Sequence, residues 1–353
     1  MEPVINRCLT CNVNLPEAIY IVPTSNIGAK IYICPQCSLV QTRPIVAKTN
    51  SAPSSTSGAG WGGLRYGKGF AAEGAFAALR TKLINHRTIL DVGAGRGYFA
   101  DIANRYWQVS KYVAVEPEAG LFTGKAELHN NTIEEFLELC DKVLPIDMFD
   151  LVHCSHTLEH LIDPAKVLHG LSLITGYGGR LYVEVPNLDI LPDVVEEMFI
   201  DRHVTHFTQT SLRNMLHSNG WRAIDSGVNG DAIWAICSAG GPRLTPRLSA
   251  EPFRVESMIK DYATRDRTKQ IRELAEKVNG LQGRTVVWGN GRIADLMREN
   301  GLNGNTVFVD RYRPGQLRPE DVKVPDNVVI ASRQYRQEIY NEIRELWGEV
   351  VVI

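Results

Sequence analysis

A short glycine-rich segment, Asp91–Gly97, constrains the fold of this chain more than any other feature. It follows the apolar run Thr88–Leu90 and leads into residues 98–103, whose pattern predicts a helix. Glycines are needed at such a turn because a Cβ atom would block both the turn and the close approach of a ligand. A strand, a glycine-rich turn and a helix start together predict an α/β sheet with a ligand site at the strand ends.

Further apolar runs predict the rest of this sheet. The turn sequence Asn229–Asp231 joins the last two runs and predicts a hairpin, so the final pair of strands should be antiparallel. Seven strands are expected in all, at residues 88–90, 112–117, 126–128, 149–155, 180–186, 221–228 and 232–238.

Glu116 ends the second of these strands, about twenty residues after the glycine turn. A carboxylate at this place can accept hydrogen bonds from both ribose hydroxyls of a nucleoside. The alternative is an acid exposed to solvent ahead of Pro117. The position of Glu116, one strand–helix unit after the glycine turn, favours the ligand-binding role.

Two segments resemble class I S-adenosylmethionine-dependent methyltransferases. Residues 91–97 resemble the first motif of that family, and residues 158–164 match its Leu-Glu-His-Leu-x-Asp-Pro signature. The resemblance covers roughly residues 68–240 and implies an α/β fold with a seven-stranded Rossmann-like sheet and S-adenosyl-L-methionine as the cofactor. The residues expected to bind this cofactor are Asp91, Gly93, Ala94, Gly95, Glu116, Pro117, Thr132, Ser155 and His156.

The composition limits the classes of function. A length of 353 residues predicts two or three domains, and 44% hydrophobic residues suffice for packed cores. A net charge of −2 argues against nucleic acid as a partner, because nucleic-acid binding usually needs a basic face. The sequence has no apolar run of about 18 residues and no signal peptide pattern, so we expect a cytoplasmic protein without a membrane partner.

Four of the seven cysteines form two pairs, Cys8-x-x-Cys11 and Cys34-x-x-Cys37. Each pair can direct two thiolates at one ion, and two pairs complete a tetrahedral Zn²⁺ site with no position left for water. A segment this small usually needs a metal to stay folded. The alternative is four free thiols in a reducing compartment. The remaining cysteines are expected to be core residues: Cys140, Cys154 and Cys237.

The chain is expected to divide into four parts. These are a zinc-binding module (residues 1–47), a linker with a candidate lid (48–67), a methyltransferase domain (68–245) and a Rossmann-like C-terminal domain (246–353). The linker is rich in serine and glycine, and the aromatic residues after it could cover a pocket, with Tyr66 touching the substrate, or form a plain entry turn.

In the C-terminal part, residues 289–294 read Gly-x-Gly-x-x-Ala, and Asp310 follows about twenty residues later. This is a nicotinamide-nucleotide pattern, and taken literally it predicts a second nucleotide site. Only about seventy residues carry it, whereas dinucleotide sites use two such halves. We therefore expect a module without a nucleotide of its own.

The three-part arrangement resembles the sugar C-methyltransferase family, and residues 34–41 are close to its zinc segment. The resemblance implies a nucleotide-linked sugar, or another intermediate of natural-product or polysaccharide synthesis, as the small-molecule acceptor. Family members carry Tyr-His-Glu-His after the fifth strand, and the Glu-His pair is assigned to proton abstraction. Here His203 matches the final histidine but Arg202 replaces the glutamate, which places C-methylation in doubt beside O- or N-methylation.

We expect His203 to act as the general base, with His206 orienting or replacing it and His160 nearby, because histidine titrates near neutral pH. Arg202 is expected to bind an anionic group of the substrate. The alternative for the histidines is a set of capping or buried polar residues. A nucleic-acid methyltransferase with a zinc reader and a non-catalytic scaffold are the other candidate functions, and the chain is expected to be a monomer or a homodimer.

Overall fold

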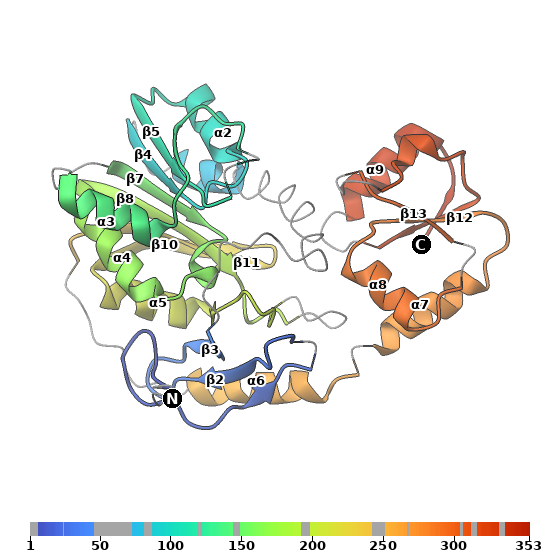
Figure 1. Ribbon diagram of the computed structural model, residues 1–353, viewed down its shortest axis with the longest axis horizontal. Coiled ribbons are helices and arrows are strands. Elements are labelled where there is room, and N and C mark those ends of the chain that lie inside the picture. Colours follow the sequence, from blue (N-terminus) through green and yellow to red (C-terminus); the bar gives the residue numbers. More distant parts are fainter. Residues whose placement is uncertain are drawn as a thin grey trace. The chain divides into compact units, whose positions relative to one another are not determined.

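The computed structural model describes residues 6–23, 25–45, 73–80, 87–118, 120, 122–143, 149–191, 198–241, 251–266, 268–303, 306–311, 316–331 and 336–353 (Figure 1). The chain forms two compact units. The described residues of the first unit lie within 1–47, 69–191 and 196–264, and those of the second unit lie within 265–353. The expected linker and lid, including Tyr66, lie outside the described residues.

A seven-stranded sheet forms the centre of the first unit. Its strands are β4 (Thr88–Val92), β5 (Lys111–Val115), β6 (Glu127–His129), β7 (Phe149–Ser155), β8 (Thr175–Pro186), β10 (Trp221–Asn229) and β11 (Ala232–Ala239). Their order is β10-β11-β8-β7-β4-β5-β6, and β11 is antiparallel to both of its neighbours. This is the sheet of class I methyltransferases, so the predicted fold class is confirmed. Strand β8 begins five residues before the predicted start. Its glycine-rich first half also belongs to the strand, because Thr175 pairs with Phe149 of β7, and the register shifts between Phe149 and Leu151.

Helices cover both faces of this sheet (Figure 1). Those on one face are α3 (Ile133–Val143), α4 (Pro164–Leu173) and α5 (Gln209–Ser218). The other face packs against α2 (Tyr98–Tyr106) and the helical residues 73–80. Along β4, Leu90 faces the first layer and Ile89 the second, as the alternation of side chains in a strand requires. Both faces are therefore buried, and the strand ends remain as the place for a site.

The N-terminal residues build a second, smaller sheet in the same unit. It consists of β1 (Tyr20–Ile21), β2 (Lys30–Ile33), β3 (Val40–Arg43) and β9 (Thr205–His206), in that order. Its last strand, β9, comes from the loop that precedes α5. The expected zinc-binding module is thus hydrogen-bonded to the loop that carries the predicted catalytic histidines.

Helix α6 (Glu251–Thr264) also belongs to the first unit. Its buried residues Val255, Ile259 and Tyr262 recur on one helix face and pack against the small sheet, where Tyr262 meets the ring of Tyr20. The expected C-terminal domain begins at residue 246, whereas the described part of the second compact unit begins at residue 265. The difference arises because the apolar face of α6 is buried on β1 and β2 (Figure 1).

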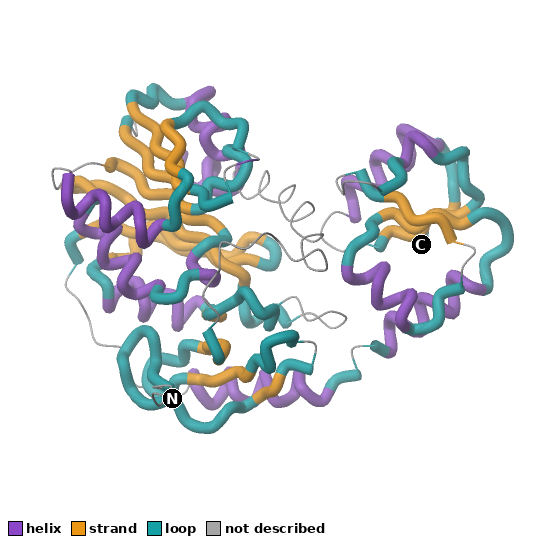
Figure 2. The backbone as a smooth tube through the Cα atoms, viewed as in Figure 1, coloured by secondary structure: helices purple, strands orange, loops and turns teal. Residues whose placement is uncertain are grey.

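The second unit contains a four-stranded parallel sheet in the order β13-β12-β14-β15 (Figure 2). Its elements are α7 (Lys269–Asn279), β12 (Thr285–Trp288), α8 (Arg292–Glu299), β13 (Thr306–Val309), β14 (Asn327–Ile330), α9 (Arg336–Trp347) and β15 (Val351–Val352). In neither unit is any described helix long and apolar enough to cross a bilayer.

Candidate active site and cysteine cluster

The glycine turn after β4 adopts the backbone that only glycine enters easily. Gly93, Gly95 and Gly97 all have positive φ angles, of 68°, 58° and 86°. A Cβ atom on Gly93 would lie 2.1 Å from the hydroxyl oxygen of Thr157, in the loop after β7. The turn is therefore packed closely against the next loop of the strand edge, and no larger residue fits at Gly93.

Glu116 lies beside this turn, as the sequence predicted from their spacing. Its carboxylate accepts hydrogen bonds from the amide of Gly95, at 2.7 Å, and from the amide of Glu118, at 2.9 Å. Each carboxylate oxygen can accept more than one hydrogen bond, so a ribose hydroxyl could still bind. The turn and the acid together supply the backbone cradle and the acceptor that a nucleoside cofactor requires, so the residues present fit S-adenosyl-L-methionine.

Asp91, also expected at the cofactor, points into the domain. Its carboxylate accepts a hydrogen bond from the hydroxyl of Tyr112 at 2.8 Å and lies 2.7 Å from Nδ1 of His153. The ring of His153 stacks on Phe99 of α2, with 3.8 Å between centroids. The contacts of Asp91 therefore support the sheet beneath the turn.

The other predicted cofactor residues lie around the strand edge. Thr132 caps α3: its amide donates to the carboxylate of Glu135, and its hydroxyl accepts from the amide of Glu135. The hydroxyl of Ser155 donates to Glu184 at 3.3 Å. Ala94 lies buried in the turn, and Pro117 is exposed after Glu116.

A cluster of one acid and three histidines lies past the ends of β7 and β8. We call Glu159, His156, His160 and His203 the acid–histidine cluster. One oxygen of Glu159 lies 3.6 Å from Nδ1 of His156 and 3.7 Å from Nε2 of His160. The rings of His160 and His203 are 4.9 Å apart. The structure therefore brings together two of the predicted catalytic residues, His160 and His203, and adds Glu159.

Backbone contacts hold this cluster in place. His156 has a positive φ of 49°, which turns the chain sharply at the end of β7. Nδ1 of His160 donates to the carbonyl of Arg202 at 3.1 Å, and Nδ1 of His203 donates to the carbonyl of Met198 at 2.8 Å. The amide of Val204 donates to the carbonyl of Glu159, so the two loops form one assembly.

The members of the cluster carry different charges. Burial disfavours the charged form of His156, but Glu159 and Glu184 raise its pKa to about 9. Burial would raise the pKa of Glu159, but His160 and His156 lower it to about 2. Burial lowers the pKa of His203. At neutral pH the site thus offers a carboxylate, an imidazolium and a neutral imidazole, which can bind and hold a proton at different atoms.

His206 lies apart from the acid, on β9. Its Nε2 is 2.8 Å from the hydroxyl of Thr42 on β3, and the ring is 2% exposed. Burial, together with neighbouring His203, lowers the pKa of His206 well below its usual value. Arg202 meets the cluster through its backbone carbonyl. The structure therefore places His206 in the small sheet itself, with its ring 6.0 Å from the ring of His203.

Glu184 is a residue of the site that sequence reasoning passed over. It is 1% exposed on β8, accepts from the hydroxyl of Tyr182 at 2.7 Å and lies 3.5 Å from Nε2 of His156. The signal was present, since a charged residue in the middle of an apolar strand needs a partner when buried. Glu159 is part of the Leu-Glu-His signature, but the sequence does not show which side chains surround it in the folded chain.

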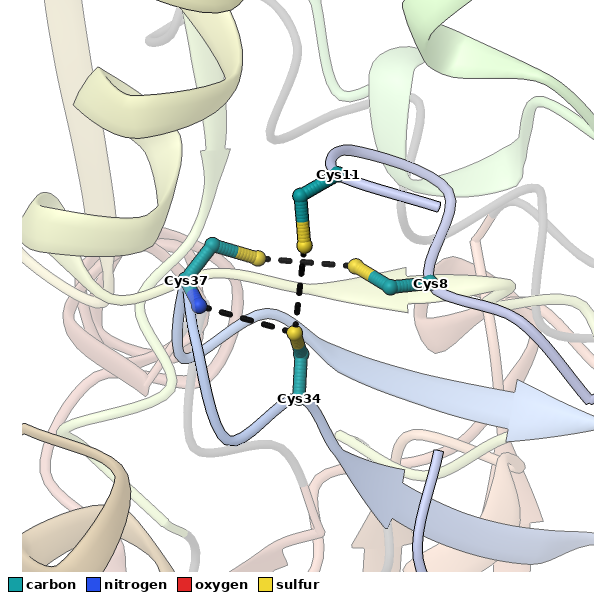
Figure 3. Close-up of side chains that lie close together, drawn as sticks. All are labelled: Cys8, Cys11, Cys34 and Cys37. Carbon is teal, nitrogen blue, oxygen red and sulfur yellow. Dashed lines mark hydrogen bonds between the residues drawn. The ribbon is translucent and has the colours of Figure 1, made fainter. Parts of the chain in front are cut away.

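The four N-terminal cysteines point at one centre (Figure 3). The sulfur atoms of Cys8 and Cys37 are 3.5 Å apart, and those of Cys11 and Cys34 are 3.4 Å apart. Tetrahedral Zn–S bonds of about 2.3 Å would place sulfur atoms about 3.8 Å apart. Amides of Thr10 and Cys37 also donate to sulfur, as in a zinc knuckle. The donor set and its spacing therefore fit a closed structural zinc site.

Comparison with known proteins assigns the central part of the chain. Residues 66–226 match the family model described as a methyltransferase domain. This part of the chain is therefore similar to methyltransferase domains. The match includes the glycine turn, Glu116 and the whole acid–histidine cluster.

One curated relative is the ubiquinone biosynthesis O-methyltransferase of Aeromonas salmonicida, 31% identical over 111 residues. The match covers 29% of this chain and 44% of the relative, so the chain spans less than half of that protein's length.

Two similar solved structures are a 1,6-didemethyltoxoflavin-N1-methyltransferase from Burkholderia thailandensis and a methyltransferase from Archaeoglobus fulgidus. The first has a TM-score of 0.41 and 16% identity and covers 64% of this chain and 99% of its own. The second has a TM-score of 0.37 and 19% identity, with coverages of 47% and 94%.

Proposed function

We propose that this chain transfers the methyl group of S-adenosyl-L-methionine to a small molecule. The observation that carries the proposal is the pairing of Gly95 with Glu116 at the edge of a methyltransferase sheet. In this proposal the cofactor lies over Gly93 and Gly95, and Glu116 accepts hydrogen bonds from its ribose hydroxyls.

The acceptor is proposed to bind at the acid–histidine cluster. Transfer from a sulfonium is an in-line displacement, so alignment and exclusion of water supply most of the catalysis. His203 is the proposed general base, since its lowered pKa keeps the ring neutral near neutral pH. Its Nδ1 donates to Met198, which leaves Nε2 as the atom that accepts the proton.

A hydroxyl is the acceptor group that we favour. Arg202 stands where a carboxylate is expected for proton removal from carbon, and the curated relative from Aeromonas salmonicida is named as an O-methyltransferase. A nucleotide-linked sugar, or another natural-product or polysaccharide intermediate, is the proposed acceptor, and Arg202 is proposed to bind its anionic part.

The test combines binding and product mass. Isothermal calorimetry should detect S-adenosyl-L-methionine bound to the purified protein, and intact-mass analysis of candidate acceptors should find a product heavier by one methyl group. Nucleotide-linked sugars should be compared with the free sugars and with a short RNA. A protein that binds no S-adenosyl-L-methionine would contradict the proposal, and methylated RNA would favour the nucleic-acid alternative.

A structural zinc ion is the second part of the proposal. The ligands would be Cys8, Cys11, Cys34 and Cys37, whose sulfur separations and knuckle amides support it. Because all four positions of a tetrahedral ion are then filled by thiolates, this ion would stabilise the fold and take no part in methyl transfer.

A further inference from the structure

Glu159, His160 and His203 present their ligand atoms to one another at short range. One such atom from each residue lies within 4.8 Å of the other two. The side chain of Glu159 is 2% exposed, and its Oε2 is buried without a hydrogen bond to any residue that the structure describes. The contacts of Glu159 with His156 and His160 are made by its Oε1, so Oε2 is the oxygen that a further cation or a proton would neutralise.

The two rings are oriented as metal-binding histidines are. In both His160 and His203, Nδ1 donates to a backbone carbonyl, at 3.1 Å and 2.8 Å. Such a contact fixes the ring and leaves Nε2 as the coordinating atom. In His160 this Nε2 lies 3.7 Å from Oε1 of Glu159.

We propose that Glu159, His160 and His203 bind a divalent transition-metal ion, distinct from the ion of the four cysteines. Two imidazoles and one carboxylate form the ligand set of catalytic zinc and of non-haem iron sites, and they leave positions open for further ligands. Bonds of about 2.1 Å in a tetrahedron separate ligand atoms by about 3.4 Å. The three side chains therefore need to close by at most about 1.4 Å, since none of the present separations exceeds 4.8 Å.

This metal site extends the proposed function. Binding of the ion does not depend on that function, and only the role of the ion in methyl transfer rests on it. An acceptor hydroxyl bound at an open position would have its pKa lowered by the cation, so it would lose its proton to solvent water more easily before its oxygen takes the methyl group from the sulfonium. With the ion bound, His203 is a ligand, and its role as a general base belongs to the ion-free cluster. The ion favours an acceptor with an oxygen available for coordination.

The experiment counts metal ions in the full chain. The protein is loaded with Zn²⁺, freed of excess by gel filtration and analysed by mass spectrometry of metals. We expect two zinc ions per wild-type chain, and one in Glu159→Gln and in His203→Gln. His129→Gln is the matched control, because His129 lies 3.1 Å from Glu127 in an exposed pair outside the cluster, and it should keep both ions.

Cobalt substitution monitors folding in the same variants. Co²⁺ bound by thiolates gives a charge-transfer band that nitrogen and oxygen ligands lack, so this band should persist in both variants while the second ion is lost. Residues that only hydrogen-bond to a metal ligand typically contribute about 10–100-fold to metal affinity. Loss of a ligand itself should weaken metal binding at the second site by more than this. One ion per wild-type chain, or two ions in both cluster variants, would overturn the proposal. Calorimetry with S-adenosyl-L-methionine on these samples tests the proposed function separately.

Discussion

At the residue scale, neighbouring carboxylates and burial separate histidines that look equivalent in the sequence. His156 contacts two acids and has a raised pKa, whereas His203 and His206 are buried and have lowered values. Sequence spacing predicted histidines at one edge of the sheet, and the structure places them there. It could not predict their charges, because those depend on burial and on how Glu159 and Glu184 lie in space relative to each ring.

Replacement of Glu116 tests the cofactor site. Glu116→Ala removes a charge-assisted pair of hydrogen bonds to ribose and should weaken the binding of S-adenosyl-L-methionine by about 2–3 kcal/mol. Calorimetry measures this change, and the exposed neighbour Glu118→Ala is the control. Equal dissociation constants for wild type and Glu116→Ala would place the ribose elsewhere.

His203→Ala should reduce turnover by about 10²–10⁴-fold, the usual contribution of a positioned base, with the cofactor dissociation constant unchanged. His217→Ala, in the last turn of α5, should leave turnover near wild type. Because the pKa of His203 is lowered, activity should persist at mildly acidic pH. Full turnover in His203→Ala would assign the loop a purely structural role.

The raised pKa of His156 predicts how stability depends on pH. The protonated ring is favoured in the folded state, where its pKa is about 9, compared with about 6.5 in the unfolded chain. Its contribution is therefore complete below pH 6.5 and is lost as the pH rises through 9. The free energy of unfolding, measured with urea between these values, should fall more steeply for wild type than for His156→Gln. Parallel curves would show that His156 is not held protonated.

At the element scale, the pairing of β3 with β9 links the cysteine cluster to the histidine loop. Val40 pairs with His206, and the hydroxyl of Thr42 contacts the ring of His206. The strands of the large sheet could be predicted from their apolar runs. Strand β9 could not, because two residues, Thr205–His206, carry no periodic pattern and their partner is remote in sequence.

Removal of the proposed zinc should therefore impair catalysis more than cofactor binding. Chelation, or Cys37→Ser, should loosen β3 and with it the histidine loop, whereas the glycine turn and Glu116 lie on other strands. Turnover should fall at least tenfold as a rough expectation for a misplaced catalytic group, with S-adenosyl-L-methionine affinity almost unchanged. Cys140→Ser, on α3, is a cysteine control. An equal loss of both properties would mean that the whole unit unfolds.

At the scale of the whole molecule, the same hydrogen bond occurs in both units: a backbone amide in the turn after one strand donates to a carboxylate after the next strand. In the second unit the amide of Asn290, in the turn after β12, donates to the carboxylate of Asp310 after β13 at 3.0 Å. The amide of Gly95 and Glu116 make the same contact in the first unit. Sequence motifs predicted both turns. They could not reveal that α6 packs on the first unit, because such docking depends on surfaces and not on local pattern.

We expect each chain to bind one cofactor molecule. The second sheet has four described strands and represents one mononucleotide half, so its turn should not hold a nucleotide by itself. Calorimetry should give a stoichiometry of one S-adenosyl-L-methionine per chain, and Asp310→Ala should keep both this number and the affinity. A second binding event with S-adenosyl-L-methionine or NAD, lost in Asp310→Ala, would reveal a second site.

The pairing of β3 with β9 also bears on synthesis of the protein. Thr42 and His206 are 164 residues apart, so β3 leaves the ribosome long before its partner strand exists. Until then β3 is an edge strand with unpaired backbone groups, which can associate with other chains. Helix α6, which covers β1 and β2, is made later still. The cysteine pairs are made early and could bind the proposed zinc ion at once. A metal-bound N-terminus would then limit aggregation of the nascent chain before β9 is made.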